Sequence, residues 1–182
     1  GALSNLGTGG SALNAVFGNS TGVDSFDPAL LTHTGTNYLH LPGVAGNYAS
    51  TPDSVALDII GDIEIVARVS MDDWTPSANS CVVSKRGAAG QYSWTLLILT
   101  TGQLQLVTTV DGTTQVASNS VIPPSPFTNG VTYWLKITRA SATGTCTWSW
   151  APDQTAEPLS WTSISPNTTG AANPIYASTA QV

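Results

Sequence analysis

Apolar and polar residues alternate along most of the chain after residue 35. In residues 62–70, for example, Ile63 and Ile65 alternate with Glu64 and Arg68. A period of two places successive side chains on opposite faces of the backbone, which is the pattern of a β-strand with one buried and one solvent-facing side. The pattern therefore predicts strands rather than amphipathic helices.

Segments of this kind recur at short intervals, separated by turn residues. Asp111-Gly112 predicts a two-residue hairpin turn, and Thr143-Gly144 predicts a second turn. The predicted strands are 36–41, 48–50, 62–70, 81–85, 92–100, 103–110, 113–120, 132–139, 145–150 and 161–164. This series predicts an all-β fold, an antiparallel β-sandwich with almost no helix.

The two ends of the chain differ from this central pattern. Residues 1–35 are rich in Gly, Asn and Ser and have weak periodicity, so we expect a loosely structured leading segment packed on a sandwich formed by residues 36–182. Residues 175–182 are strand-like but no closing turn follows, and the first residue is not Met. We therefore expect either that the parent polypeptide is longer or that another subunit covers this edge.

Charge is scarce in this sequence. Only 9% of the 182 residues are charged, with 5 Lys or Arg against 11 Asp or Glu, a formal net charge of −6. So few cations cannot neutralise a run of phosphates, and an acidic chain is repelled by anionic bilayers. No apolar run approaches the roughly 20 residues that span a membrane. Nucleic acid and membrane partners are therefore not expected.

The two cysteines, Cys81 and Cys146, have no neighbouring Cys or His at metal-ligand spacing. Two interpretations remain open for them. Both are small buried side chains, or they form one cross-strand disulfide.

Several short motifs, in order along the chain, carry a resemblance to a known family. These motifs are Asn37–Ser50, Gly61–Ile65, Asp72–Pro76, Val83–Lys85, Tyr92–Leu99, Asp111–Thr114 and Tyr133–Ile137. From about Asp24 onward the chain resembles the concanavalin A-like lectin/glucanase domain, a laminin-G-like jelly roll. The version it resembles is found in minor tail proteins of phages that infect actinobacteria. The resemblance implies a jelly roll that lacks its last strand or strands, an extracellular location on the virion, and often a trimeric homo-oligomer.

Glucanases of this superfamily carry paired carboxylates on one strand in a Glu-x-Asp-x-x-Glu motif, and the nearest approach here is Asp62-Ile63-Glu64. Period two places Asp62 and Glu64 on one face, as retaining glycosidases require of their two carboxyls. The third acidic position holds Ala67, however, and the chain has neither a Gly-x-Ser-x-Gly elbow nor histidines beyond His33 and His40. We therefore expect no enzyme activity and interpret the carboxylates as surface charges.

Calcium frequently accompanies jelly-roll lectins and needs several oxygen ligands that converge from loops. Asp24 and Asp27 are the candidate ligands, and Asp72-Asp73 is a second acidic pair. The alternative is that Asp27-Pro28 simply forms a turn. The sequence implies no other cofactor.

Sugar binding is the third candidate chemistry, because aromatic faces stack on pyranose rings while polar groups fix the hydroxyls. Among six Trp, the candidates for exposure are Trp134, Trp148 and Trp150, and the last two share a face by period two. A core role is the alternative, since Trp is highly buried on average. Arg68 and Lys136 are candidate cations beside this surface.

These patterns favour a non-catalytic module of a phage tail that binds carbohydrate of the host cell envelope. The alternative is a structural or decoration protein of the virion that contacts other tail or capsid subunits. A glycoside hydrolase is the least favoured of the three classes.

Overall fold

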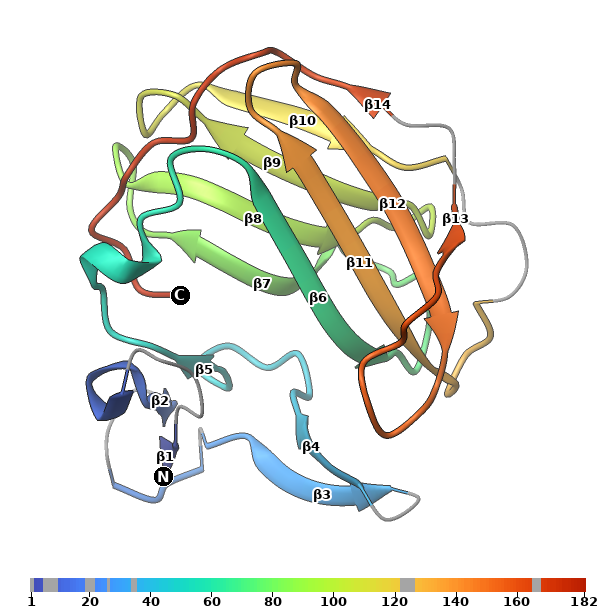
Figure 1. Cartoon of the computed structure of the whole chain (residues 1–182). Helices are drawn as coiled ribbons and strands as arrows, with labels where there is room; N and C mark the ends of the chain where they lie inside the picture. The colour runs from blue at the N-terminus through green and yellow to red at the C-terminus, as the bar shows by residue number, and fades with distance from the viewer. Residues whose placement is uncertain are drawn as a thin grey trace. The chain divides into compact units, whose positions relative to one another are not determined.

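The structure is a computed structural model that describes residues 2–4, 10–18, 22–25, 27–33, 36–121, 127–164 and 168–182 (Figure 1). It is nearly all β, with antiparallel pairing in every sheet. The chain forms two compact units, one of Gly1–Leu57 with Thr179–Val182 and one of Asp58–Ser178. No helix in the described residues is long and apolar enough to cross a membrane.

The first unit, called the leading unit below, contains two small sheets. Strands β1 (Ala2–Leu3), β2 (Ala15–Phe17) and β5 (Ala49–Ser50) form one, and β3 (Ala29–His33) pairs with β4 (Thr36–His40) in the other. Two 3₁₀ helices, η1 (Gly10–Leu13) and η2 (Val55–Leu57), complete the elements. Thr51 and Val182 exchange backbone hydrogen bonds in both directions, so the last residue belongs to this unit.

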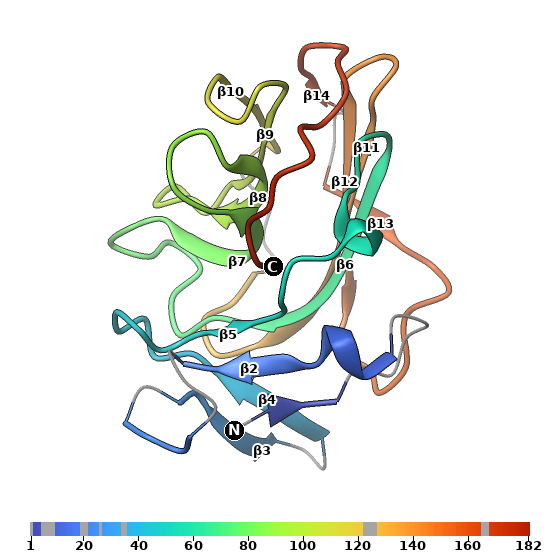
Figure 2. The same cartoon turned by 90° about the vertical axis from the view of Figure 1, so that its left-hand side faces the viewer.

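The second unit is a sandwich of two sheets. The front sheet has the order β13 (Thr162–Ser163), β12 (Thr145–Pro152), β11 (Thr132–Ala140) and β6 (Ile63–Ser70), with β14 (Thr168–Thr169) also paired to β12. The back sheet has the order β10 (Gln115–Asn119), β9 (Leu104–Thr109), β8 (Tyr92–Ile98) and β7 (Ser80–Arg86). Figure 2 shows the two sheets as separate layers, as expected from the alternating sequence.

The core lies between these sheets, because each strand turns its apolar side chains inward. Strand β11 shows this most clearly, since its buried and partly exposed residues alternate over all nine positions. The fully buried side chains include four from the back sheet, Leu96, Ile98, Leu104 and Leu106, and three from the front sheet, Leu135, Ile137 and Trp148. Burial of such side chains contributes roughly 1.5–3 kcal/mol each, so this layer supplies the main stabilisation of the unit.

A C-terminal segment, residues 170–178, closes the space between the sheets without forming a strand (Figure 2). Ile175 is 2% exposed, and its N–H donates to the Ile60 carbonyl, 3.0 Å away, just before β6. The next residue, Tyr176, bonds the back sheet, because its N–H donates to the Thr109 carbonyl and its carbonyl accepts from Ser93 Oγ. The segment therefore connects the two layers. Residues 175–182, which were expected to be strand-like, form no strand.

The predicted strands of the sandwich are confirmed within two residues at each end. The expected strands at 36–41 and 48–50 correspond to β4 and β5. The structure adds β3 in the segment that the sequence left irregular, and the contact boundary between the units falls at Leu57 rather than at residue 35. Cys81 and Cys146 are both free thiols, so they do not form the disulfide that was one of the two interpretations. Only Cys146 is a buried side chain, since Cys81 is exposed.

Candidate functional site

The side of the front sheet that faces away from the back sheet carries polar side chains in register across its strands. We call it the outer face. One row joins Thr138 to Thr147, and the next joins Lys136 to Ser149 and Ser163. All of these residues are partly or fully exposed. Because the same strands supply the inner core, the β alternation itself produces this hydroxyl-rich surface.

Trp134 is the aromatic residue of the outer face. It lies on β11 between Arg68 of β6 and Ala151 of β12, which are its partners in register. Its indole Nε1–H donates to the carbonyl of Gln154 at 2.9 Å. That bond fixes the edge of the ring, and the side chain remains partly exposed. An indole held in this way is a preorganised surface for stacking.

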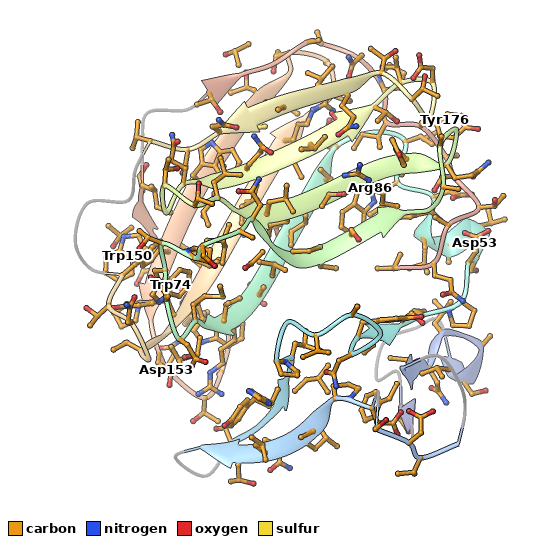
Figure 3. All side chains as sticks on the ribbon, turned by 180° about the vertical axis from the view of Figure 1, so that it is seen from behind. Asp53, Trp74, Arg86, Trp150, Asp153 and Tyr176 are labelled. Carbon is orange, nitrogen blue, oxygen red and sulfur yellow. The ribbon has the colours of Figure 1, made fainter. Side chains whose placement is uncertain are left out.

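Two ion pairs flank Trp134. The Arg68 guanidinium forms a bidentate pair with Asp153, with Nε–Oδ1 at 2.6 Å and Nη2–Oδ2 at 2.9 Å, and this contact raises the pKa of Arg68. Lys136 Nζ lies 2.8 Å from Glu64 Oε2. Each cation of the outer face thus has its own carboxylate. Asp153 is labelled in Figure 3, where it lies at the same end of the sandwich as Trp150.

A second aromatic ring belongs to this surface. The Lys136 ammonium lies 5.7 Å from the ring centroid of Trp161, a cation–π distance. Trp161 directly precedes β13 and is partly exposed. The outer face therefore combines Trp134 and Trp161 with two ion pairs and a row of hydroxyls.

The expected exposure of Trp148 is wrong, whereas Trp150 is partly exposed. They share a face, as period two requires, but that face is the inner one. Trp148 is 1% exposed, and its indole N–H donates to Thr168 Oγ1 at 3.0 Å. Trp150 lies edge-on to Phe127 and Tyr133, with ring centroids 6.2 and 5.8 Å away. Alternation pairs residues on one side of a strand but does not identify the side that faces the core.

The inner cluster also contains Trp74, a buried residue of the loop after β6 that stacks on Phe127 at 4.7 Å (Figure 3). Four aromatic rings, those of Trp74, Phe127, Tyr133 and Trp150, therefore pack together at one end of the sandwich. Of the five residues expected to bind carbohydrate, the structure brings together Arg68, Trp134 and Lys136.

The carboxylates considered for catalysis line an open hollow on the outer face together with Thr138. Asp62 Oδ1 accepts hydrogen bonds from the backbone N–H of Ser141 at 2.7 Å and from its hydroxyl at 2.9 Å. These donors lower the pKa of Asp62. A general acid needs a raised pKa, so the environment of Asp62 is the reverse of what proton donation requires. Glu64 is committed to Lys136.

The acidic residues proposed for calcium lie in turns. The Asp27 backbone N–H donates to the Asp24 carbonyl at 3.2 Å in the turn that leads to β3. Asp73 Oδ1 accepts from the N–H and the hydroxyl of Thr75, which lowers the pKa of Asp73. In the described part of the chain, no three His, Cys, Asp or Glu side chains are grouped to hold a metal ion. Calcium binding by Asp24 and Asp27 stays a prediction. A melting midpoint that is higher with calcium than with chelator would support it, and equal midpoints would contradict it.

Trp161 and Asp153 were not expected on the outer face, whereas the alternation in residues 62–70 already placed Glu64 on the same side as Arg68. Asp153 lies 85 residues from Arg68, and it reaches its partner only because β12 and β6 both flank β11. The sequence signal for this surface was the register of hydroxyl-bearing positions on the predicted strands. No pattern in the loop of residues 153–161 indicates where that loop returns.

Comparison with known proteins gives no relative. No protein-family model, no curated protein and no solved structure matches this chain.

Proposed function

We propose that the chain is a non-catalytic, lectin-like module of a phage tail that binds carbohydrate of the host cell envelope through the outer face. The observation that carries this proposal is the position of Trp134. Its ring is partly exposed, its N–H is satisfied by Gln154, and the hydroxyls of Thr138, Ser149 and Ser163 lie on the same surface. Stacking on an aromatic face combined with hydrogen bonds from polar neighbours is how proteins recognise sugars.

A non-catalytic role is favoured by the state of the carboxylates. Asp62 is held ionised by Ser141, and Glu64 is paired with Lys136. Asp62 is therefore poorly suited to donate a proton to a glycosidic oxygen. The tail, virion and jelly-roll parts of the proposal rest on the motifs that resemble tail proteins, among them Asn37–Ser50 and Tyr133–Ile137.

Binding to isolated actinobacterial cell walls tests this function. Trp134→Ala should weaken binding at least tenfold, which corresponds to about 1.4 kcal/mol of lost stacking energy. Tyr92→Ala is the matched control, because Tyr92 is a partly exposed aromatic residue of the back sheet whose ring lies beneath Arg86. Equal binding by the wild type and Trp134→Ala would refute the outer face as the binding surface.

A second function is favoured by a different observation, in the leading unit. Eight of the thirteen exposed large apolar side chains of the described residues lie between residues 23 and 55. On the β3–β4 hairpin, Leu31 and Tyr38 are direct cross-strand partners and are 42% and 41% exposed. An apolar surface without cations is suited to contact with other tail or capsid subunits, further copies of this chain included.

The structural alternative is tested by the oligomeric state. Light scattering after gel filtration should report an assembly, a trimer in the version implied by the family resemblance. The double variant Leu31→Ser, Tyr38→Ser should shift that assembly toward the monomer, whereas Val110→Ser, in the turn after β9 and 40% exposed, should not. A monomeric wild type at all concentrations would contradict this alternative.

A further inference from the structure

The outer face is electrically balanced. Arg68 and Asp153 form one pair, and Lys136 and Glu64 form the other, so the two cations beside Trp134 are each matched by an anion. The Arg68–Asp153 pair uses both Nε and Nη2 against the two carboxylate oxygens, which is the strongest geometry for this contact. Among the residues that the structure describes, this face therefore presents no unpaired cation to a ligand.

Charge balance decides which sugars suit such a surface. A uronic acid or a phosphorylated sugar would have to displace Asp153 or Glu64, and it would leave that carboxylate next to another anion. The chain as a whole carries a net charge of −6, which also repels an acidic polymer at long range. A neutral sugar meets neither obstacle, because its hydroxyls can donate to the lone pairs that the paired carboxylates still hold.

The surroundings of Trp134 agree with an uncharged ligand. The indole N–H is already occupied by the Gln154 carbonyl, so the ring has only its π-face to offer. Across the strands, its neighbours in register are Arg68 and Ala151, and Ala151 is only 4% exposed. A stacked ring would therefore meet an apolar floor at Trp134 and ion-pair edges around it.

We infer that the outer face selects uncharged polysaccharides and discriminates against acidic ones, with Trp134 as the stacking surface and the Arg68–Asp153 and Lys136–Glu64 pairs as the barrier to anions. This inference rests on the proposed carbohydrate-binding function. The inference specifies the class of glycan that the surface binds. Its main support is the two ion pairs, in addition to the aromatic residue.

The experiment measures binding of the full chain to neutral polymers (mannan, dextran and galactan) and to acidic polymers (polygalacturonate and hyaluronate) by isothermal titration. We expect at least one neutral polymer to bind, with less than a twofold change between 20 and 300 mM NaCl. We expect the acidic polymers to bind at least tenfold more weakly. Tighter binding of an acidic polymer, lost with added salt, would overturn the inference and leave carbohydrate binding intact. Binding to none of the five polymers would overturn the proposed function itself.

Removal of one carboxylate gives an independent readout. Asp153→Asn frees the Arg68 guanidinium, so it should raise the affinity for polygalacturonate at least fivefold and make that binding salt-dependent. Asp53→Asn removes the same charge from an exposed position of the leading unit and serves as the control for net charge. Equal gains in the two variants would show that only net charge matters and would overturn the role assigned to the ion pairs.

Discussion

The two faces of the front sheet are made by the same strands and have opposite characters. On β11 and β12, Trp148 and Trp150 point into the sandwich, and Trp134 points outward beside Lys136. The inward residues contact other aromatic rings and Thr168 of β14. The outward residues contact carboxylates and hydroxyls. The side of the strand on which a tryptophan lies therefore decides whether it packs in the core or is accessible to a ligand. Its neighbours in the sequence do not decide this.

Cationic side chains also differ according to whether they point outward from the front sheet or into the space between the two sheets. Arg68 and Lys136 lie outward in ion pairs with exposed partners, whereas Lys85 and Arg139 lie inward and are 0% and 2% exposed. Arg139 Nη2 donates to the carbonyls of Ala171 and Asn173, and Lys85 Nζ lies 3.0 Å from Asp58. Inward cations thus hold the C-terminal segment and the entry to β6, while outward cations shape a surface.

The largest effect should come from the inner aromatic residues. Trp148→Ala removes a fully buried ring and its bond to Thr168, so we expect a loss of about 3 to 5 kcal/mol in the free energy of unfolding. Trp134→Ala, on the outer face, should lose less than about 1 kcal/mol because its side chain is partly exposed. Urea denaturation of both variants measures the difference, and equal losses would contradict the division between the faces.

The inner cation should come next. Arg139→Met leaves the carbonyls of Ala171 and Asn173 without their donor inside the protein, which should cost about 1 to 3 kcal/mol. The loss should be accompanied by faster amide exchange at Ile175 and Tyr176, because the C-terminal segment loses its anchor on the front sheet. Unchanged exchange there would show that the segment is held by its backbone bonds alone.

The outer cation should matter less to stability. Arg68→Met removes a pair whose side chains are 20% and 30% exposed, so the expected loss in the free energy of unfolding is at most about 1 kcal/mol. Added salt should shrink the difference between variant and wild type, since solvent-accessible pairs are screened. A loss as large as that of Arg139→Met would remove the distinction between inner and outer cations.

The smallest effect concerns exposed turns around the sheets. Hydrogen bonds from Ser141, Thr75 and Thr114 lower the pKa of Asp62, Asp73 and Asp111 respectively. A pKa below its unfolded value means that these groups stabilise the fold above about pH 4 and that this stabilisation is lost as the pH falls further. The melting midpoint should be flat from pH 7 to 5 and should decline below pH 4. Asp111→Asn should reduce that decline, and an unchanged decline in this variant would contradict the role of these hydrogen bonds.

The sequence predicted the front and back sheets well for identifiable reasons. Strand β6 was found because Ile63 and Ile65 alternate with Glu64, and the β9–β10 turn was found because Asp111-Gly112 permits a tight reversal, with Gly112 at φ 80°. Such signals are local, since they depend on residues two or three positions apart. Strand β3 had no such signal, because Ala29–His33 does not alternate.

The candidate site was predictable only in part. Placing Trp134, Lys136 and Arg68 together needed only period two and pairing of neighbouring strands. Predicting that Trp148 and Trp150 lie on the inner face would have required knowing which side of β12 faces the back sheet. That side is evident only from the burial of Trp148 and its hydrogen bond to Thr168. Predicting that Asp153, Gln154 and Trp161 lie beside these residues would have required the path of a polar loop, which the sequence pattern does not indicate.

The amino-acid sequence alone predicts an antiparallel all-β fold, the alternation that separates two faces on every strand, and a surface with few cations. Only the tertiary structure decided which face is buried, which cations are neutralised and by which carboxylates, and which tryptophan remains available. The physical reason is that alternation is a property of one strand. Burial and charge pairing depend on contacts between segments as distant as Arg68 and Asp153, which only the packed sheets bring together.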